Sequence, residues 1–353
     1  MKILYAVCSW GLGHLTRSLP IIKKLAEENE IFVVSTGRTL VAARHSLIEE
    51  NVKFIDIPDY PQPFTKNPSF FFLKFSFCLP AILNNIRKEH EQIEKIVRKE
   101  KIKLIVSDSK YGIFSKVPSY FIAHQLRFIA PFGMTYFTEY FNSKLQKKFN
   151  KILVPDFPDF ENSLSGDLSH NLKFFNKNKI VYFGAISSFH KRNLKEDVDV
   201  FISISGPEVQ RKVFEETVLN QVGELNGKIV VSLGTPEKKF SETRGNAQIY
   251  SYLENSKREE LLNRSKIVVT RSGYSTIMDL AETGRKALFV PTKNQTEQEY
   301  LGEFHLKRKN FYCISQDKLN LKEDLKKAKK YNGLNPKWNT KKSLKIFLDT
   351  LFM

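Results

Sequence analysis

The chain has 353 residues, which is too long for one ordinary hydrophobic core and suits two domains. Hydrophobic residues make up 41% of it, so a sizeable core is available and wholesale disorder is not expected. The net charge of +18 indicates an anionic partner, such as a nucleic acid, a membrane surface or a phosphorylated small molecule, with a merely solvated basic surface as the equal alternative. Because no zinc-finger, basic-zipper or RNA-recognition motif is present, we expect no nucleic acid partner.

The cysteines and the N-terminal sequence bear on the cellular compartment of the protein. Cys8, Cys78 and Cys313 lie far apart and lack the spacing of a metal site, and so sparse and odd a number fits a reducing compartment. The chain passes from Met1 and Lys2 directly into a strand pattern, without the features of a signal peptide. We therefore expect a cytoplasmic protein.

Short aliphatic runs alternate with helix-like segments almost throughout the chain. They are apolar on both faces, as in a parallel sheet that helices cover on both sides. In the first half these runs are residues 2–7, 30–36, 52–57, 101–108, 119–124, 151–156 and 179–186. In the second half they are residues 199–206, 228–234, 266–272 and 286–292. The expected fold class is α/β, with two Rossmann-like, doubly wound domains.

The charged, apolar-poor stretch 187–198 separates the two halves and is the expected linker. The expected N-terminal domain is residues 1–186, and the expected C-terminal domain is residues 199–335. Residues 336–353 form a predicted C-terminal helix that packs back on the N-terminal domain. Because open α/β sheets bind ligands at the carboxyl ends of their strands, we expect the site in a cleft where these ends of the two domains face each other.

Residues 67–88, NPSFFFLKFSFCLPAILNNIRK, interrupt the alternation. The apolar run is broken by Lys74 and is too short to span a bilayer comfortably. One interpretation is a buried helix packed on the first sheet, and another is a dimer contact. The third is an aromatic, lysine-flanked surface that rests on an anionic membrane or an acceptor lipid, at the inner face of the cell membrane.

The loop after the first strand, CSWGLGHLTRSLP, carries Gly11 and Gly13 and opens a helix. A dinucleotide site needs a third glycine where Thr16 stands, and an acid at the end of the second strand, where none is present. The free N–H groups and the helix dipole still suit an anion. His14 then points into the cleft, where a neutral imidazole can take a proton from a hydroxyl; a helix-capping histidine without chemistry is the alternative.

Two further polar residues end neighbouring strands of the first half. Asp108 ends the run 101–108, where a buried carboxylate can orient His14, although a capping or turn residue is the alternative. His124 ends the run 119–124 and is a rival base, with a hydrogen-bonded interior histidine as the alternative.

The stretch 268–300 carries the stronger signal. A strand leads into an Arg-Ser-Gly turn at 271–273 and then into a helix, which makes a second anion-binding turn. Asp279, one to two turns into that helix, can accept hydrogen bonds from both hydroxyls of a ribose. The loop 203–207 comes after another strand and again opens a helix. Two phosphate-type loops with a ribose acid describe a site for a nucleoside diphosphate.

This stretch resembles the donor-binding half of GT-B glycosyltransferases, most closely the family 28 enzymes typified by MurG-type transferases. That family has an acid, usually Glu, six residues after the glycine of the turn, as Asp279 comes six residues after Gly273 here. Its F-V-P strand end and glutamine-containing helix match residues 289–291 and Gln298. Its diphosphate loop, G-G-S-x-G, is reduced here to Ser-Ile-Ser-Gly-Pro at 203–207.

The resemblance implies an inverting transfer of a sugar from a UDP-sugar, such as UDP-N-acetylglucosamine, to a lipid-linked or other amphipathic acceptor. It places the uracil pocket near Tyr252 and Leu253 and the acceptor loop at the Gly-x-Gly-His sequence. It implies no cofactor and no metal ion. The D-x-D sequence at 197–199 is expected to be an ordinary entry into a strand.

The candidate residues fall into three groups. The catalytic pair is His14 and Asp108. The donor-binding residues are Ser205, Gly206, Leu253, Arg271, Ser272, Gly273, Ser275, Thr276, Asp279, Gln295 and Gln298. The acceptor-binding residues are Gly11, Gly13, Thr16 and His124.

Two other functions compete with this one. A non-hydrolysing UDP-sugar 2-epimerase shares the two-domain architecture, but such enzymes generally use several carboxylates and histidines, and the candidate cleft is poor in carboxylates. A basic nucleic-acid-binding protein would instead show steeply salt-dependent binding to nucleic acid and no affinity for UDP.

Overall fold

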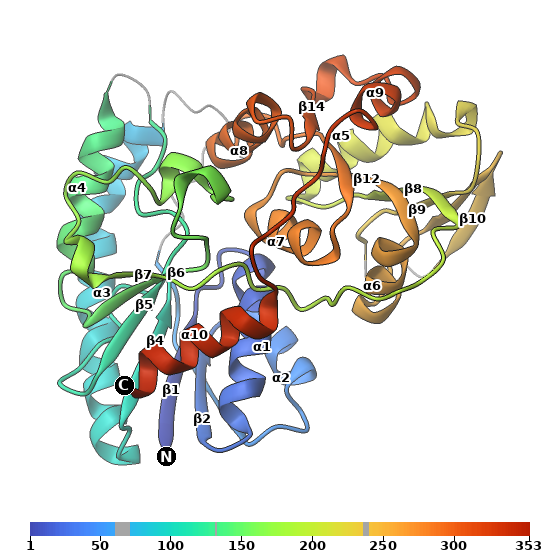
Figure 1. The fold of residues 1–353 in the computed structure, drawn as a ribbon. Helices are drawn as coiled ribbons and strands as arrows, with labels where there is room; N and C mark the ends of the chain where they lie inside the picture. The colour runs from blue at the N-terminus through green and yellow to red at the C-terminus, as the bar shows by residue number, and fades with distance from the viewer. Residues whose placement is uncertain (61–70, 131–132, 236–239) are drawn as a thin grey trace. The chain divides into compact units, whose positions relative to one another are not determined.

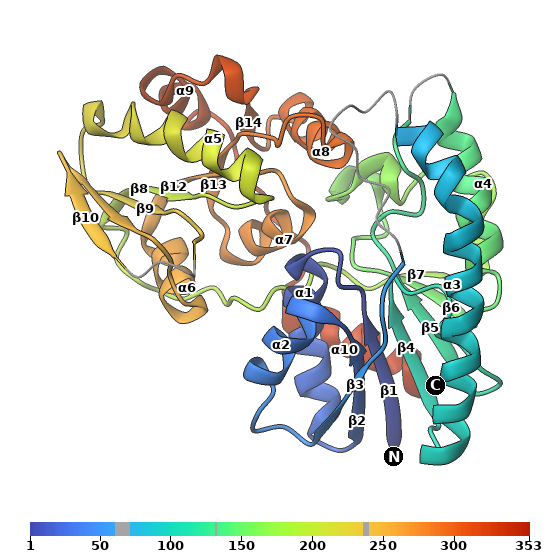
Figure 2. The ribbon, with the colours of Figure 1, turned by 180° about the vertical axis from the view of Figure 1, so that it is seen from behind.

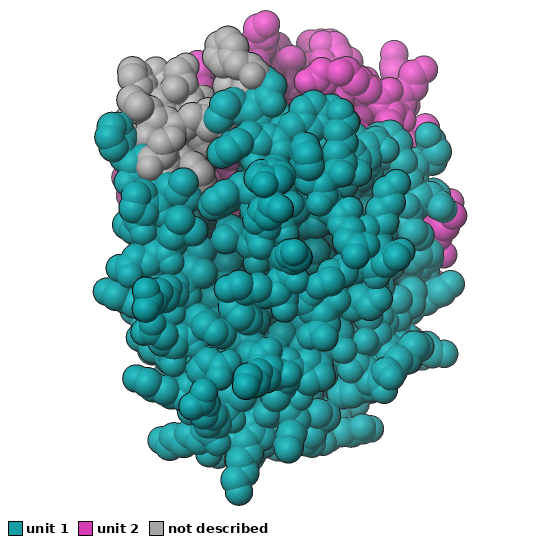
Figure 3. Space-filling view, turned by 90° about the vertical axis from the view of Figure 1, so that its left-hand side faces the viewer, with its two compact units in different colours: residues 1–188, 338–353 teal, residues 189–337 magenta. Residues whose placement is uncertain are grey.

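The computed structural model describes residues 1–60, 71–130, 133–235 and 240–353, with the side chains of 71–76 also outside the description. The chain folds into two compact units (Figure 3). Unit 1 consists of residues 1–188 and 338–353, and unit 2 of residues 189–337. The C-terminal helix thus belongs to the N-terminal unit.

The stretch expected to be a linker is divided between the units, because most of it packs against a helix of unit 2. The main-chain N–H of Arg192 donates to Oδ1 of Asn263 at 2.7 Å. The side-chain amide of the same asparagine donates to the carbonyl of His190 at 2.9 Å. Residues 189–198 are therefore tied to the second unit.

Unit 1 is a seven-stranded parallel sheet with the strand order β3-β2-β1-β4-β5-β6-β7. Its strands are β1 (Lys2–Val7), β2 (Glu30–Ser35), β3 (Val52–Asp56), β4 (Leu104–Asp108), β5 (Ser119–Ile122), β6 (Lys151–Val154) and β7 (Ile180–Tyr182). Its helices are α1 (Leu12–Ala26), α2 (Gly37–Ser46), α3 (Phe71–Glu100), α4 (Met134–Gln146) and α10 (Thr340–Phe352), with single 3-10 turns at Phe160–Asn162, Gly166–Leu168 and Lys177–Lys179.

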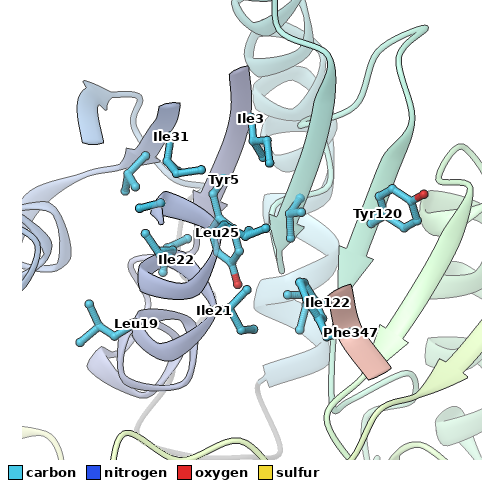
Figure 4. Packing of buried hydrophobic residues seen from close by; sticks show 14 of the residues in the cluster. Ile3, Tyr5, Leu19, Ile21, Ile22, Leu25, Ile31, Tyr120, Ile122 and Phe347 are labelled. Atoms are coloured by element: carbon cyan, nitrogen blue, oxygen red, sulfur yellow. The ribbon is translucent and has the colours of Figure 1, made fainter. Parts of the chain in front are cut away.

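Alternate residues of the central strands supply two cores, one on each face of the sheet. Ile3 and Tyr5 of β1 pack with α1, α2 and α10, where Phe347 closes the cluster (Figure 4). Leu4 of the same strand faces the other way and packs with Ile93 of α3. Figures 1 and 2 show α3 on this second face with α4 beside it.

Unit 2 is a second seven-stranded sheet with the order β10-β11-β9-β8-β12-β13-β14, parallel except for β10. Its strands are β8 (Val198–Ser203), β9 (Ile229–Ser232), β10 (Ser241–Arg244), β11 (Ala247–Tyr250), β12 (Ser265–Thr270), β13 (Lys286–Phe289) and β14 (Tyr312–Cys313). Its helices are α5 (Glu208–Leu219), α6 (Asn255–Arg264), α7 (Tyr274–Thr283), α8 (Thr296–Lys307) and α9 (Leu321–Ala328), with 3-10 turns at Val222–Glu224 and Gln316–Lys318.

The core of unit 2 lies under α5 and α9, which cover one face of the sheet while α6 lies on the other (Figure 1). Phe214 of α5 and Leu321 of α9 are fully buried there. The predicted fold class, two doubly wound α/β domains, is confirmed. The antiparallel hairpin of β10 and β11 and the short edge strand β14 were not predicted, because their sequences lack long aliphatic runs.

The described part of the aromatic segment 67–88 is the first half of α3. Phe77 is 78% exposed, whereas Ile82 is buried. Residues 61–70 and the side chains of 71–76 are outside the described part of the chain, and most of the expected membrane-contacting stretch falls there. No helix in the described ranges is long and apolar enough to cross a membrane.

Candidate active site

In each sheet the chain reverses its direction of winding at one pair of neighbouring strands. In unit 1 the pair is β1 and β4, and in unit 2 it is β8 and β12. The crevice at the carboxyl ends of such a pair is where open α/β sheets bind ligands, because the helices after the two strands lead away on opposite faces. Most of the predicted site residues come directly after these four strands.

His14 and Asp108 meet at this place in unit 1. The loop after β1 leads to Gly11, whose backbone is extended, and α1 begins at Leu12, so His14 lies in the first turn of the helix. Asp108 is the last residue of β4 and is fully buried. Nδ1 of His14 lies 2.9 Å from Oδ1 of Asp108, and the histidine side chain is 21% exposed.

Arg17 completes the arrangement, and sequence reasoning missed it. It is three residues after His14 on α1, so both side chains lie on one face of the helix. Its Nε donates to Oδ2 of Asp108 at 2.7 Å, and its Nη2 donates to Oδ1. Its Nη1 lies 2.7 Å from Nδ1 of His124. A buried carboxylate such as Asp108 requires a cation nearby. Arg17, three residues after His14 on the same helix face, could have been predicted as that cation.

These contacts assign opposite tautomers to the two histidines. The carboxylate of Asp108 only accepts hydrogen bonds, so its contact with His14 requires a proton on Nδ1 and leaves Nε2 bare. Nη2 of Arg17 also lies 2.9 Å from this Nδ1, but it already donates to the same carboxylate, so Asp108 decides the tautomer. Arg17 only donates, so its contact with His124 requires a bare Nδ1 and places the proton on Nε2. His14 can therefore accept a proton at its Nε2, whereas His124 can donate a hydrogen bond from its own Nε2.

Asp108 stays ionised in spite of its burial. Burial alone raises the pKa of a carboxyl group, but the guanidinium of Arg17 and the imidazole of His14 outweigh it and hold the pKa of Asp108 well below its usual range. Ser18 adds a hydrogen bond from its hydroxyl to Oδ2 at 3.0 Å. A permanent negative charge thus faces Nδ1 of the histidine.

Of the predicted acceptor-binding residues, the glycines lie at the start of α1, and the side chains of the others have hydrogen-bond partners within the protein. Gly11 is exposed, and a side chain there would meet nothing within 4 Å, while Gly13 lies in the first turn of α1. The hydroxyl of Thr16 differs from the expectation, because it donates to the carbonyl of Leu12 inside the helix at 2.9 Å. His124 is half-buried in the loop after β5 and points its Nδ1 at Arg17.

A second buried ion cluster anchors the loop that leads to the histidine. Lys110 is fully buried and pairs with Asp59 and, at 2.9 Å, with Glu89 of α3. Asp59 also accepts the main-chain N–H of Ser9, in the loop after β1. Burial tends to lower the pKa of the Lys110 ammonium, but the two carboxylates outweigh it and raise that pKa. The cluster therefore ties the loops after β1 and β4 together.

In unit 2, a small pocket lies at the carboxyl ends of β8 and β12, whose last residues Ser203 and Thr270 are paired in the sheet. Three predicted donor residues line it together: Ser205, Thr276 and Asp279. Its full lining is Phe201, Ser203, Ser205, Arg258, Leu262, Val268, Thr270, Thr276, Asp279 and Leu280. Arg258, on α6, was not predicted, since nothing in its local sequence distinguishes it from a surface arginine.

Arg271 differs from its expected role as a contact of the leaving group. Its side chain is buried, and its guanidinium donates to the carbonyls of Val290, Pro291 and Gln210 at 3.0–3.1 Å. It also stacks on Phe214, with Cζ 4.2 Å from the ring centroid. Burial lowers the pKa of Arg271 to about 10, so it is still charged at neutral pH. The arginine holds the loop after β13 in place instead of reaching into the pocket.

Ser272 and Gln298 also serve the scaffold. The hydroxyl of Ser272 is fully buried and donates to the carbonyl of Gln298 at 2.6 Å, so only its main chain is left for the predicted donor binding. Oε1 of Gln298 accepts the main-chain N–H of Thr292 at 2.9 Å. Its Nε2 lies 3.9 Å from the point where a Cβ on Gly273 would lie, so the amide nitrogen faces the start of α7.

The other donor residues lie at helix starts or apart from the pocket. Gly273 precedes α7, and Ser275 lies half-buried in its first turn. Gln295 precedes α8 in the same way, and Gly206 is exposed just before α5. Leu253 is buried after β11 and does not line the pocket.

The two carboxylates of the D-x-D sequence are engaged by cations of the protein. Asp197 accepts from Arg264 at 2.6 and 2.7 Å and from Lys228 at 3.0 Å. Asp199 accepts from Lys266 at 2.7 Å. Within the described ranges no group of three or more His, Cys, Asp or Glu side chains is arranged to hold a metal ion.

Known proteins similar to this chain identify the class. Residues 202–346 match the family model of the glycosyltransferase family 28 C-terminal domain. A relative from Methanosarcina mazei, described as an uncharacterized glycosyltransferase, is 24% identical over 330 residues, which cover 85% of this chain and 82% of the relative.

Three solved structures share the fold at low identity. Acinetobacter baumannii MurG has a TM-score of 0.57 at 13% identity, covering 99% of both chains. The spinosyn rhamnosyltransferase SpnG, complexed with thymidine diphosphate, has 0.58 at 12% identity, covering 100% of this chain and 93% of that one. UDP-GlcNAc 2-epimerase from Neisseria meningitidis, bound to UDP-GlcNAc, has 0.56 at 13% identity, covering 99% of both chains.

The fold and the matched domain together define a glycosyltransferase of the GT-B class. Within that class, residues 202–346 match the C-terminal domain of glycosyltransferase family 28, so the resemblance predicted from the sequence is confirmed.

Proposed function

We propose that the protein transfers a sugar from a UDP-sugar to a hydroxyl group of an amphipathic acceptor, with inversion at the anomeric carbon. The observation that carries this proposal is the His14–Asp108 pair, in which the bare Nε2 belongs to a partly exposed imidazole and the carboxylate is buried and ionised. Such a pair removes a proton from a hydroxyl during attack.

The proposed reaction is a single displacement. Nε2 of His14 takes the proton of the acceptor hydroxyl while the acceptor oxygen forms a bond to the anomeric carbon. The bond from that carbon to the diphosphate oxygen breaks, and its electron pair leaves with UDP. Attack opposite the leaving group inverts the configuration. Asp108 stabilises the imidazolium that forms, because its charge lies 2.9 Å from Nδ1.

The donor is assigned to unit 2. Asp279 is proposed to accept hydrogen bonds from the ribose hydroxyls, since it shares a pocket with Ser205 and Thr276. The N-termini of α5 and α7, which come after β8 and β12, are proposed to stabilise the diphosphate through free N–H groups and the helix dipoles. We propose that this transfer requires no metal ion, because these helix ends carry the role that a cation plays in other transferases.

Titration calorimetry with UDP, TDP and GDP tests the donor. We expect UDP to bind, and Asp279→Asn to weaken it about 10- to 100-fold, because a hydrogen bond to a charged group contributes about 1.5–3 kcal/mol. Asp199→Asn is the matched control, since this carboxylate lies in the same unit but pairs with Lys266 at the surface. Binding of TDP or GDP without UDP would refute the UDP assignment.

A UDP-sugar 2-epimerase is the second candidate, and the shared fold of the Neisseria enzyme supports it. Incubation with UDP-N-acetylglucosamine alone separates the two functions. An epimerase converts the sugar to its 2-epimer without any acceptor, whereas a transferase leaves it unchanged until an acceptor is added. Appearance of the epimer would replace the transferase proposal.

An amphipathic acceptor is supported by an aromatic surface on unit 1, which we call the α4 patch: Phe128, Tyr136, Phe137, Tyr140 and Phe174, all 40–52% exposed. Lys173 lies over the ring of Tyr136 at 3.9 Å, and Lys144 over that of Tyr140 at 4.9 Å. Aromatic rings mixed with lysines suit the interface of an anionic membrane, where rings insert and cations meet headgroups. We propose that the protein is cytoplasmic and binds the inner membrane face peripherally through this patch.

Sedimentation with vesicles of phosphatidylglycerol or phosphatidylcholine tests the membrane proposal. We expect binding to the anionic vesicles only, weakened by salt, and several-fold less binding for the double variant Phe137→Ser/Tyr140→Ser. Val209→Ser is the control, because Val209 is 70% exposed on unit 2. Equal sedimentation of the double variant and the wild type would exclude the α4 patch.

A further inference from the structure

Thr292, two residues beyond Val290 in the loop after β13, has a buried hydroxyl with no hydrogen-bond partner among the described residues. The residue is only 2% exposed. Its main chain is held on both sides: its N–H donates to Oε1 of Gln298 at 2.9 Å, and its carbonyl accepts the N–H of Gln295 at 3.1 Å. The main chain of Thr292 is therefore held in place on both sides of the side chain.

The hydroxyl faces the turn between β8 and α5. Oγ1 of Thr292 lies 3.7 Å from the point where a Cβ on Gly206 would lie, and apart from Gly206 and its two chain neighbours no other described residue has an atom within 4 Å of that point. Gly206 has a φ of +116°, which disfavours any other residue, and it is exposed. The glycine thus leaves the hydroxyl next to an accessible helix start.

This helix start is suited to an anion but is short of donors. Within the described residues the N-cap residue Pro207 makes no capping hydrogen bond to α5, so the N–H groups of its first turn have no partner inside the helix, and Pro207 itself has no N–H. Glu208, in the first turn, is exposed and pairs with Lys212 at 2.8 Å. The hydroxyl of Thr292 beside Gly206 can supply the hydrogen-bond donor that Pro207 lacks.

We propose that Oγ1 of Thr292 donates a hydrogen bond to a diphosphate oxygen of the nucleotide sugar and so compensates for the reduced glycine content of the loop 203–207. This inference rests on the proposed donor site. An unpaired buried hydroxyl lowers the stability of the free protein, and hydrogen bonding to the ligand recovers that loss on binding.

The proposal predicts opposite effects of one substitution. Thr292→Val keeps the shape and removes the hydroxyl, so the ligand-free protein should unfold about 2–4 °C higher, while UDP should bind about 10-fold more weakly. A hydroxyl with only a structural role would instead lower the melting temperature on removal and leave the affinity for UDP unchanged.

Calorimetry on the full chain tests this, with scanning runs for unfolding and titrations with UDP and uridine. Thr292→Ser should bind UDP within about 3-fold of wild type, and neither variant should change uridine binding, because uridine has no diphosphate. Thr283→Val is the control, since the hydroxyl of Thr283 is paired with the carbonyl of Asp279 at 2.7 Å.

The outcomes are distinct. If wild type binds UDP and Thr292→Val binds it equally well, the role of Thr292 is refuted and the proposed function stands. Equal weakening of UDP and uridine would also refute it, because the hydroxyl would then act on the nucleoside or the fold. If wild type binds no UDP, the proposed donor site fails and this inference fails with it.

Discussion

Replacing Arg17 by leucine removes the counter-ion of a fully buried carboxylate. Arg17 is 4% exposed and donates to both oxygens of Asp108, once at 2.7 Å. The remaining contacts are the hydroxyl of Ser18 at 3.0 Å and the ring of His14 at 2.9 Å, and neither carries a permanent positive charge. The carboxylate is therefore left buried without a full compensating charge.

The expected loss in the free energy of unfolding is about 3–5 kcal/mol, as for other buried pairs broken on one side. This is a large part of the roughly 5–15 kcal/mol that stabilises a typical domain. Most of the loss comes from the unpaired charge, so the double variant Arg17→Leu/Asp108→Asn should recover a substantial part of it. Arg17→Lys should lose less than Arg17→Leu, because it keeps a cation without the bidentate geometry.

Tryptophan fluorescence during denaturation measures this loss in unit 1 alone. The chain has two tryptophans, Trp10 and Trp338, and both lie in unit 1. The control is Lys24→Leu on the same helix, whose pair with Glu27 is exposed to solvent and should contribute little to stability. A loss below about 1 kcal/mol for Arg17→Leu, or a double variant no more stable than the single one, would refute the buried ion pair.

Three further predictions concern the same unit. His14→Ala should lower turnover about 10²- to 10⁴-fold in a transfer assay with little change in UDP affinity, and His14→Asn should lower turnover nearly as much. Near-normal turnover of His14→Ala would mean that the histidine has only a structural role. The pKa of Asp108 lies below its ordinary value of 3.8, so the folded state binds fewer protons than the unfolded state, and the stabilisation that is present at neutral pH is lost as the pH falls below about 4. Denaturation at several pH values should show a smaller pH dependence of the free energy of unfolding for Asp108→Asn than for the wild type. The same pH dependence in both would contradict the pairing. Lys110→Met should destabilise unit 1 by about 3–5 kcal/mol in the fluorescence assay, since it leaves Asp59 and Glu89 buried without a cation, and an unchanged stability would contradict this cluster.

The sequence by itself determined where the strands lie and which polar residues stand at their ends. Aliphatic runs specify buried parallel strands through local composition, and a polar residue at the end of such a run lies at the carboxyl edge of the sheet. Asp108 at the end of β4 was found in this way, and His14 and Asp279 were found from the glycine-containing turns and helices that come after β1 and β12. The hairpin of β10 and β11 was missed because its strands are short and polar, and only pairing with β9 defines them.

Only the tertiary structure decided which polar side chains point into a site and which form hydrogen bonds within the protein. Arg17 and Arg271 both lie close to a glycine-containing turn, yet the first meets a buried carboxylate and the second meets main-chain carbonyls of distant loops. The hydroxyl of Thr292 is buried without a hydrogen-bond partner among the described residues, and nothing in its local sequence indicates this. These properties depend on residues far apart in the chain, because a buried polar group takes its partner from whatever packing brings near it, and local sequence carries no record of that neighbour.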